Sequence, residues 1–232
     1  MSQNTNIPVF PSLRPIPKVA LRVWDLPIRL FHWSLVLLIG ISWLSGKKGA
    51  IEVHMVVGLC LFTILLFRFL WGFVGSTTAR FSHFVCGPRS LWAYLNGLWR
   101  GLPDYSSIGH NPAGSLAIIL ILMTLAIQIT SGLFANDDIY TQGPLAYLVT
   151  KATSDFLTTL HKINLTILLI IILLHILVNI FNIFFISKNN IISMITGYKY
   201  VYVNNDELSF GSNLKASLTF IISAIIIMII IL

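Results

Sequence analysis

The sequence predicts an all-α protein, a transmembrane bundle with a four-helix core and a fifth, C-terminal helix. The chain of 232 residues is 56% hydrophobic and only 10% charged, and its mean hydropathy is +0.85. These values lie outside the range of water-soluble domains. Five apolar runs also approach the roughly 20 residues that a helix needs to cross a hydrocarbon layer of about 30 Å. We therefore expect lipid to surround most of the chain.

The expected spans cover residues 28–44, 51–73, 115–134, 157–186 and 214–232. The last run is apolar enough to cross a membrane but lacks a polar anchor at its C-terminal end, so a partly inserted tail is the alternative to a fifth crossing. Residues 88–102, PRSLWAYLNGLWRGL, mix Trp, Tyr and Arg as helices in a membrane interface do. An ordinary loop helix is the alternative there.

The ends of the chain differ from its apolar middle. Residues 1–20 are polar and rich in proline, which predicts a flexible cytoplasmic arm without a cleavable signal peptide. Residues 21–200 form the expected transmembrane domain, and residues 201–232 form a linker with the fifth helix. Cys60 and Cys86 stand outside any C-x-x-C-H motif, which argues against covalent haem attachment and a disulfide framework.

The net charge of +7 is distributed among the connections, a pattern that indicates membrane topology and not nucleic-acid binding. Basic residues gather before the first span and around the second and fourth connections: Arg14, Lys18, Arg22, Arg29, Arg68, Arg80, Arg89, Arg100, Lys188, Lys199 and Lys215. The opposite connections mix both signs: Lys47, Lys48, Lys151 and Lys162 with Glu52, Asp137, Asp138 and Asp155. The positive-inside rule therefore predicts a cytoplasmic N-terminus and, with five spans, an external C-terminus.

Four histidines lie within or at the ends of the spans, where an unpaired ionisable group is costly: His32, His54, His161 and His175. His161 and His175 are 14 residues apart, so they share one helix face at depths about 21 Å apart. The directions of the spans match His54 with His161 in depth, and His32 with His175. Paired imidazoles fill both axial positions of haem iron, which favours electron transfer. This matching favours two stacked haems over isolated hydrogen-bonded histidines.

Two further residues are candidates for cofactor binding. Gly58, four residues beyond His54, shares its helix face and would let a flat macrocycle approach the backbone. Close helix packing is the alternative. Arg68, 14 residues after His54, reaches the cytoplasmic end, where a cation could neutralise haem propionates or attract a quinone headgroup. Topological anchoring is an equal alternative for Arg68.

Other polar residues receive weaker predictions. His83 lies in the long second connection and is expected to be solvated, and the role of His110, at the mouth of the third span, stays open. Gln128, Thr130 and Ser131 could hydrogen-bond a propionate or a quinone, or could simply join helices.

Several stretches resemble bacterial cytochrome b561 and related cytochrome b/b6-domain proteins over about residues 20–200. They are RVWDLPIRLFHWSLVLLIGISWLSG at 22–46, HMVVGLCLFTILLFRFLWGFVG at 54–75, GHNPAG at 109–114, the LHKI and LLHI sites around His161 and His175, and MITGYK at 194–199. The first stretch is the most specific.

This resemblance implies a four-helix cytochrome of the bacterial inner membrane that binds two b haems through four histidines. It implies electron exchange between quinone and a partner such as a c-type cytochrome or a dehydrogenase. His32, His54, His161 and His175 inherit the ligand role by position. The run after Asn213 extends beyond the four-helix core, as in hydrogenase-type cytochrome b subunits, which resemble this group and leave the electron donor open.

Three function classes remain open from the sequence. The first is an electron carrier, with quinone oxidoreductase activity undecided. The second is a haem-free transporter in which the histidines move protons or bind metal ions. That class expects acidic partners, yet only Glu52 stands at the margin of the first, second and fourth spans. The third is a haem-containing membrane anchor subunit of an oxidoreductase complex.

Overall fold

The computed structural model describes residues 18–101, 109–139, 141–185, 190–202 and 208–232. The predicted flexible arm falls mainly on residues 1–17, outside the described residues. The elements in chain order are β1 (Lys18–Arg22), α1 (Leu26–Lys47), α2 (Ile51–Val74), η1 (Thr77–Ala79), α3 (Phe81–Phe84), α4 (Pro88–Trp99), α5 (Pro112–Leu133), η2 (Ala146–Leu148), α6 (Lys151–Phe185), α7 (Asn190–Thr196), β2 (Tyr198–Tyr202) and α8 (Asn213–Ile231).

The predicted all-α class with five candidate spans is confirmed. α1, α2, α5, α6 and α8 are each long and apolar enough to cross a membrane. The last apolar run forms one continuous helix, α8. α6 begins at Lys151, six residues before the expected start at 157, because its polar first turns continue a helix that hydropathy identifies only in its apolar part. A helix, α4, also forms where the aromatic and basic segment predicted one.

Local sequence signals explain where the helices start. Asp25 caps α1 and accepts a hydrogen bond from Ile28 N, and Asn111 caps α5 and accepts one from Gly114 N. Proline occupies the first turn of both helices, where its missing N–H costs no hydrogen bond. Ser212 caps α8 in the same way through Lys215 N. In α1, α5 and α8 the polar residue before the apolar run therefore fixes the start of the span.

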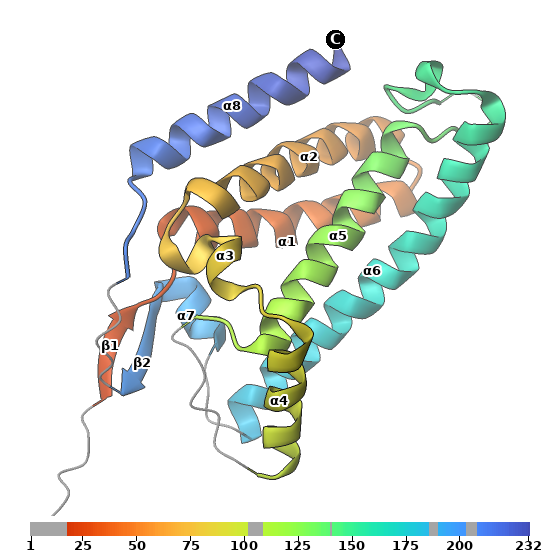
Figure 1. Cartoon of the computed structure of the whole chain (residues 1–232). Helices are drawn as coiled ribbons and strands as arrows, with labels where there is room; N and C mark the ends of the chain where they lie inside the picture. The colour runs from red at the N-terminus through yellow and green to blue at the C-terminus, as the bar shows by residue number, and fades with distance from the viewer. Residues whose placement is uncertain (1–17, 102–108, 140, 186–189, 203–207) are drawn as a thin grey trace, which may run out of the picture.

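The bundle consists of two antiparallel helix pairs joined through α2 (Figure 1). α1 lies against α2, α5 lies against α6, and α2 also contacts α5 and α8. The central core lies between the two pairs and contains Leu35, Val57, Leu61, Ile64, Leu65, Leu122, Leu125, Ile129 and Leu168. α8 buries one face against α2, formed by Ala216, Thr219, Ser223 and Ile227. The fifth helix is thus an addition to the four-helix core, on the α2 side.

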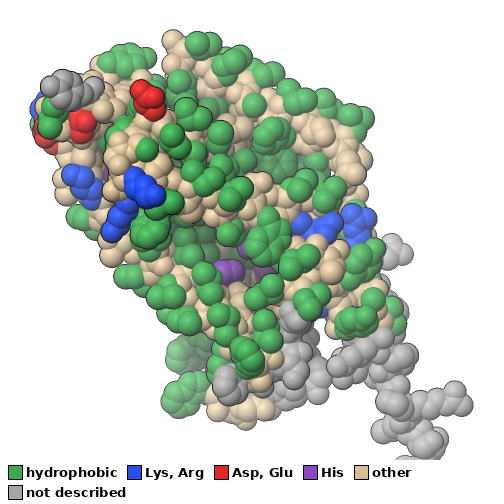
Figure 2. All heavy atoms as spheres, turned by 180° about the vertical axis from the view of Figure 1, so that it is seen from behind, with side chains coloured by type: hydrophobic (Ala, Val, Ile, Leu, Met, Phe, Trp, Pro, Cys, Tyr) green, Lys and Arg blue, Asp and Glu red, His purple; other side chains and the backbone are tan. Residues whose placement is uncertain are grey.

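The outer surface of the bundle is apolar. Large side chains of α6 and α8 are more than one third exposed, among them Ile170, Leu174, Val178, Ile222 and Met228. Hydrophobic side chains cover much of the face shown in Figure 2, and charged side chains are confined to its ends. A water-soluble protein rarely exposes so large an apolar area, so this surface fits a lipid environment.

A small sheet that the sequence did not predict joins the two ends of the four-helix core. β1 pairs with β2 in antiparallel register, and Val23 N and Trp24 N both donate to Gly197 O, at 2.8 and 3.1 Å. Gly197 has φ +90°, and a Cβ there would lie 2.9 Å from Trp24 O, so this turn requires glycine. Arg29 also donates to the Ile195 carbonyl. The RVWDLP and MITGYK stretches of the resemblance are therefore contact partners.

Asp25 joins three segments at this end of the bundle, and its side chain is only 1% exposed. One carboxylate oxygen accepts the Ile28 N–H at 2.7 Å, and the other accepts the Trp71 indole N–H at 3.1 Å and the Ser76 hydroxyl. Ser76 Oγ in turn accepts Gly211 N at 2.9 Å. The carboxylate thereby links the start of α1, the end of α2 and the approach to α8.

We expect Asp25→Ala to lower the free energy of unfolding by about 2–5 kcal/mol, because a helix cap is lost and buried donors are left unpaired. Asp25→Asn, which keeps an accepting oxygen, should lose less. Thermal unfolding in detergent, followed by far-ultraviolet circular dichroism, measures both. Asp138→Ala, whose side chain is 66% exposed, serves as the control and should change little. Equal losses in Asp25→Ala and Asp138→Ala would contradict the linking role of Asp25.

Candidate functional site

His54 and His161 meet at one end of the bundle. His54 lies in the first turn of α2 and His161 in the third turn of α6. Their ring centres are 6.1 Å apart and their planes are inclined by 83°. The structure thus brings together two histidines that were matched in depth from the sequence. Their role as ligands stays a prediction.

Each of these two rings is oriented by a backbone carbonyl of the neighbouring helix. His54 Nδ1 lies 2.8 Å from Ser42 O in α1, and His161 Nδ1 lies 2.9 Å from Gln128 O in α5. A carbonyl only accepts hydrogen bonds, so Nδ1 must carry the proton in both rings. Nε2 then keeps its lone pair, as in a histidine prepared to bind a metal ion.

The spacing of the rings fits one metal ion between them. A histidine nitrogen lies about 2.0–2.1 Å from a bound metal ion and about 1 Å from its own ring centre, so two opposed imidazoles on one ion have centres about 6 Å apart. The measured separation is 6.1 Å. Among the described residues, no group of three or more His, Cys, Asp and Glu side chains could hold a metal ion.

His32 and His175 lie toward the other end of the bundle, on α1 and α6. His175 is within electrostatic range of His32, but no ring contact joins these two residues in the structure as described. His32 Nδ1 is buried without a hydrogen-bond partner. His175 Nε2 lies 3.5 Å from Asn179 Nδ2, which also donates to the His175 carbonyl at 2.8 Å. This pair is therefore less closely associated than His54 and His161.

A further histidine, His110, lies half-buried near the second pair with its Nδ1 out of contact with solvent, an arrangement that the sequence did not reveal. Its ring centre is 4.5 Å from that of Trp24 and 5.1 Å from that of Phe84. Burial, with the positive charges of Arg68 and Lys199 nearby, lowers the pKa of His110 to about 3, so the ring is neutral at physiological pH. The only local signal was its place directly before the helix cap Asn111.

Arg68 is a buried cation at the same end of the bundle. Its side chain is 4% exposed, and its Nη1 has no hydrogen-bond partner. The guanidinium carbon lies 5.0 Å from the ring centre of Phe81 and 5.7 Å from that of Phe84, and Asp25 is within electrostatic range. Buried charges are usually paired, so an unpaired Nη1 is suited to an anionic or carbonyl oxygen of a bound group. Surface anchoring alone does not account for this burial.

Gly58 faces open space, since a Cβ at this position would meet no atom within 4 Å. Close helix packing, the alternative reading of this glycine, is therefore absent around Gly58. Figure 2 shows histidine side chains within a recess bordered by hydrophobic side chains. Open space beside the helix backbone and a recess that exposes histidine both fit a flat, apolar cofactor with axial ligands.

Three polar residues of α5 take different roles. Thr130 is exposed, and Ser131 is buried and donates to Ile127 O of its own helix at 2.6 Å. The Gln128 side chain accepts a hydrogen bond from Asn164 Nδ2 at 2.7 Å. Asn164 also donates to the Thr124 carbonyl at 2.8 Å and is 3% exposed. Asn164 was not predicted as important, although its place three residues after His161 puts both on one helix face. It holds α6 against α5 at the level of His161.

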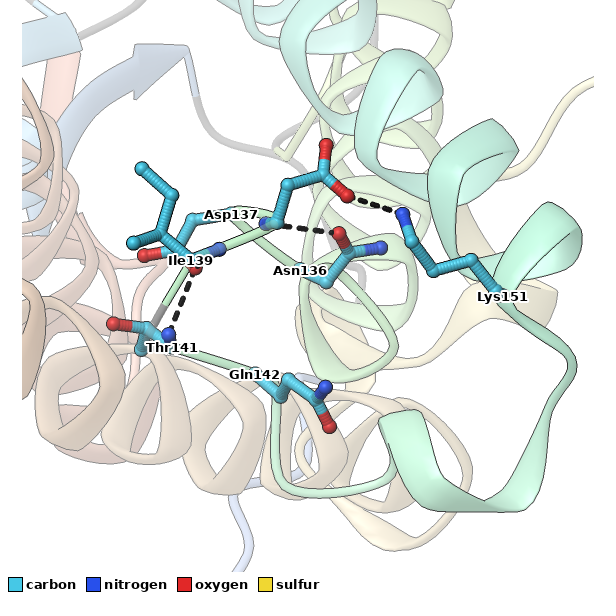
Figure 3. Close-up of a pocket in the computed structure, with 7 residues that line it drawn as sticks. Asn136, Asp137, Ile139, Thr141, Gln142 and Lys151 are labelled. Atoms are coloured by element: carbon cyan, nitrogen blue, oxygen red, sulfur yellow. Dashed lines mark hydrogen bonds and ion pairs between the residues drawn. The ribbon is translucent and has the colours of Figure 1, made fainter.

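A surface pocket of about 320 Å³ lies in the loop between α5 and α6 (Figure 3). It is lined by Asn136, Asp137, Asp138, Ile139, Thr141, Gln142 and Lys151. Lys151 pairs with Asp138 and with Asp155, and the Asp137 carboxylate accepts two backbone N–H groups of its own loop. These groups satisfy one another and all lie outside the histidine pairs, so the pocket is part of the loop structure.

Comparison with known proteins identifies a matching family and two distant relatives. The sequence profile of the family described as prokaryotic cytochrome b561 matches residues 23–197. Two curated relatives, from Escherichia coli K12 and Escherichia coli O157:H7, are each described as a probable Ni/Fe-hydrogenase 1 B-type cytochrome subunit. Both are 25% identical, over 47% of this chain and 57% of the relative, so the chain spans little more than half of their length. No solved structure matches the chain significantly.

Proposed function

The chain belongs to the prokaryotic cytochrome b561 family, and from this membership we propose that it binds two b haems and transfers electrons between a quinone and a redox partner. Bound haem would supply reversible one-electron chemistry. The chain would supply the axial imidazoles, their spacing and a surrounding of low dielectric constant. The proposal places one haem at each end of the bundle, so that electrons could cross most of the membrane.

The observation that carries the proposal is the His54–His161 pair. Its rings have the separation that suits two ligands of one iron, and both keep Nε2 free because Nδ1 is bonded to a carbonyl. Two histidine ligands leave no open position for oxygen, which favours electron transfer over oxygen chemistry. Gly58, one turn along α2 from His54, leaves space for a macrocycle.

We assign the second haem to His32 and His175. The support is their matched depth, their electrostatic proximity and the buried, unpaired Nδ1 of His32. Arg68 lies at this end with a free, buried Nη1 and would bind a propionate or a quinone headgroup through charge-assisted hydrogen bonds. Quinone exchange is therefore proposed at the end of the bundle that holds Arg68.

The redox partner is proposed to be a c-type cytochrome, a dehydrogenase or a hydrogenase. The two relatives are named as hydrogenase cytochrome subunits, which supports an oxidoreductase partner. In such a complex the chain would also act as a membrane anchor. A haem-free transporter has less support, because the described residues contain no group of three or more metal-binding side chains. The two carboxylates within the histidine-bearing helices do not bond the histidines either: Asp155 of α6 pairs with Lys151, and Glu52 of α2 is exposed.

The proposed location is the bacterial inner membrane, with a cytoplasmic N-terminus. The support for this orientation is the basic character of the segments before α1, after α2 and after α6, compared with the mixed charges of the other connections. The Arg68 end would then be cytoplasmic, and the His54–His161 end would be external.

We expect purified wild-type protein, expressed with an adequate supply of haem, to contain two b haems per chain. His54→Ala and His161→Ala should each lose the same haem, and His32→Ala and His175→Ala the other, because one axial bond alone does not hold the iron in its low-spin state. Haem is measured as the pyridine haemochrome, together with oxidised and reduced spectra. His83→Ala, at an exposed position, is the control. A haem-free wild type would reject the proposal and favour a proton or metal site.

Arg68→Met should lower haem or quinone affinity about 10- to 100-fold, because a charge-assisted hydrogen bond contributes about 1.5–3 kcal/mol. The apoprotein should keep its thermal stability or gain some, since a buried and unpaired charge is removed. Haem titration of the apoprotein and quinol-driven haem reduction measure the two affinities. Arg89→Met, at an exposed position, should change neither. Unchanged affinities with lower stability would instead assign Arg68 a purely structural role.

The orientation predicts the behaviour of reporter fusions. Alkaline phosphatase, which is active only outside the cytoplasm, should be active when fused after Leu232 and inactive when fused after Arg100. Green fluorescent protein should give the opposite result. The reverse pattern would place the basic connections outside and reject the orientation. Inactivity of both phosphatase fusions would mean that the fifth helix does not cross.

A further inference from the structure

The two carbonyls that orient His54 and His161 belong to five-residue segments that both end in Ser–Gly, near the C-terminal ends of α1 and α5. Residues 42–46 of α1 read SWLSG, and residues 128–132 of α5 read QITSG. In both, the oriented histidine bonds the carbonyl of the first residue, and the segment ends with Ser–Gly. The two segments lie in different helix pairs, so each could supply one side of the same site.

The serine of each segment is buried beside the carbonyl that orients the histidine, with 7% exposure for Ser45 and 1% for Ser131. Ser45 Oγ donates to Ser42 O at 3.0 Å. Ser131 Oγ lies 3.1 Å from Gln128 O but only 2.6 Å from Ile127 O, so its hydroxyl donates mainly to Ile127 O. Both serines therefore bond within their own helix, and what the two segments share is the imidazole N–H that each first carbonyl accepts.

The glycine of each segment makes room for the ring. A Cβ on Gly46 would lie 3.1 Å from His54 Nδ1, and a Cβ on Gly132 would lie 2.9 Å from His161 Cε1. Helical Cβ atoms lean toward the N-terminus, so the side chain of residue i+4 stands beside the carbonyl of residue i. Only glycine at i+4 leaves that carbonyl open to a ring from the next helix. By contrast, Gly40, also in α1, has no atom within 4 Å of such a Cβ.

We propose that residues 42–46 and 128–132, called here the two imidazole seats, each hold one of the two histidine rings that would bind the iron of one haem. Gly46 and Gly132 act as positioning residues. This inference rests on the proposed haem at His54 and His161. Each seat fixes one ring by its Nδ1–H bond and by contact with the glycine, and together they hold the ring planes at 83°. The bonded Nδ1–H raises the basicity of Nε2, which stabilises oxidised iron and lowers the potential.

The test compares Gly46→Ala and Gly132→Ala with the control Gly40→Ala in the haem-loaded, full-length protein. All three changes favour the helix by a similar amount, but only the first two push an imidazole away from its carbonyl. Potentiometric titration measures the midpoint potential of each haem, and electron paramagnetic resonance reports the orientation of the axial rings. The haem missing from His54→Ala identifies which signals belong to this site.

We expect the potential of that haem to rise in both variants, more in Gly132→Ala than in Gly46→Ala because its contact is closer. Its low-spin resonance should shift, while the other haem and the Gly40→Ala protein stay unchanged. Loss of that haem with full retention of the other would also support the seats. Potentials and resonances equal to those of Gly40→Ala would overturn the inference. Absence of any haem bound through His54 in the wild type would reject the proposed function instead.

Discussion

Lipid offers no hydrogen-bond partners, so polar groups within the helices must be satisfied by the chain or by a bound group. Many polar side chains donate to backbone carbonyls of their own helix, as Thr219 and Ser223 of α8 do. Asn164 and the Nδ1–H groups of His54 and His161 donate instead to backbone carbonyls of a neighbouring helix. These bonds between helices decide which helix faces meet, because the apolar contacts around them are less directional.

The exceptions to this rule gather at one end of the bundle. His32 Nδ1 and Arg68 Nη1 are buried without partners, and neutral His110 lies within electrostatic range of Arg68. Such groups are costly in an apolar surrounding. A bound haem and quinone headgroup would offer the anionic and carbonyl oxygens that this end lacks, whereas the His54–His161 end is already arranged by the protein alone. The two ends thus differ in how far the chain by itself orients its histidines.

The frame that holds both ends depends on contacts between segments remote in sequence. Asp25 connects α1 to Trp71 and Ser76, and the β1–β2 sheet carries the segment after α7 back to the start of α1. The RVWDLP and MITGYK stretches are family signals, and their meeting around Gly197 gives that resemblance a physical reason. α8 adds to this frame on the α2 side and leaves the core helices in place.

Hydropathy acts locally, so the amino-acid sequence was enough to predict the five spans. The rise per residue and the helix directions also predicted that His54 and His161 share a depth, and the structure brings these two rings together. The small sheet, the packing of His110 against Trp24 and Phe84, and the contact of Gly46 and Gly132 with imidazole rings could not be predicted in this way. They depend on the rotation of each helix about its axis and on the folding back of connections, which are set by packing between segments distant in the sequence.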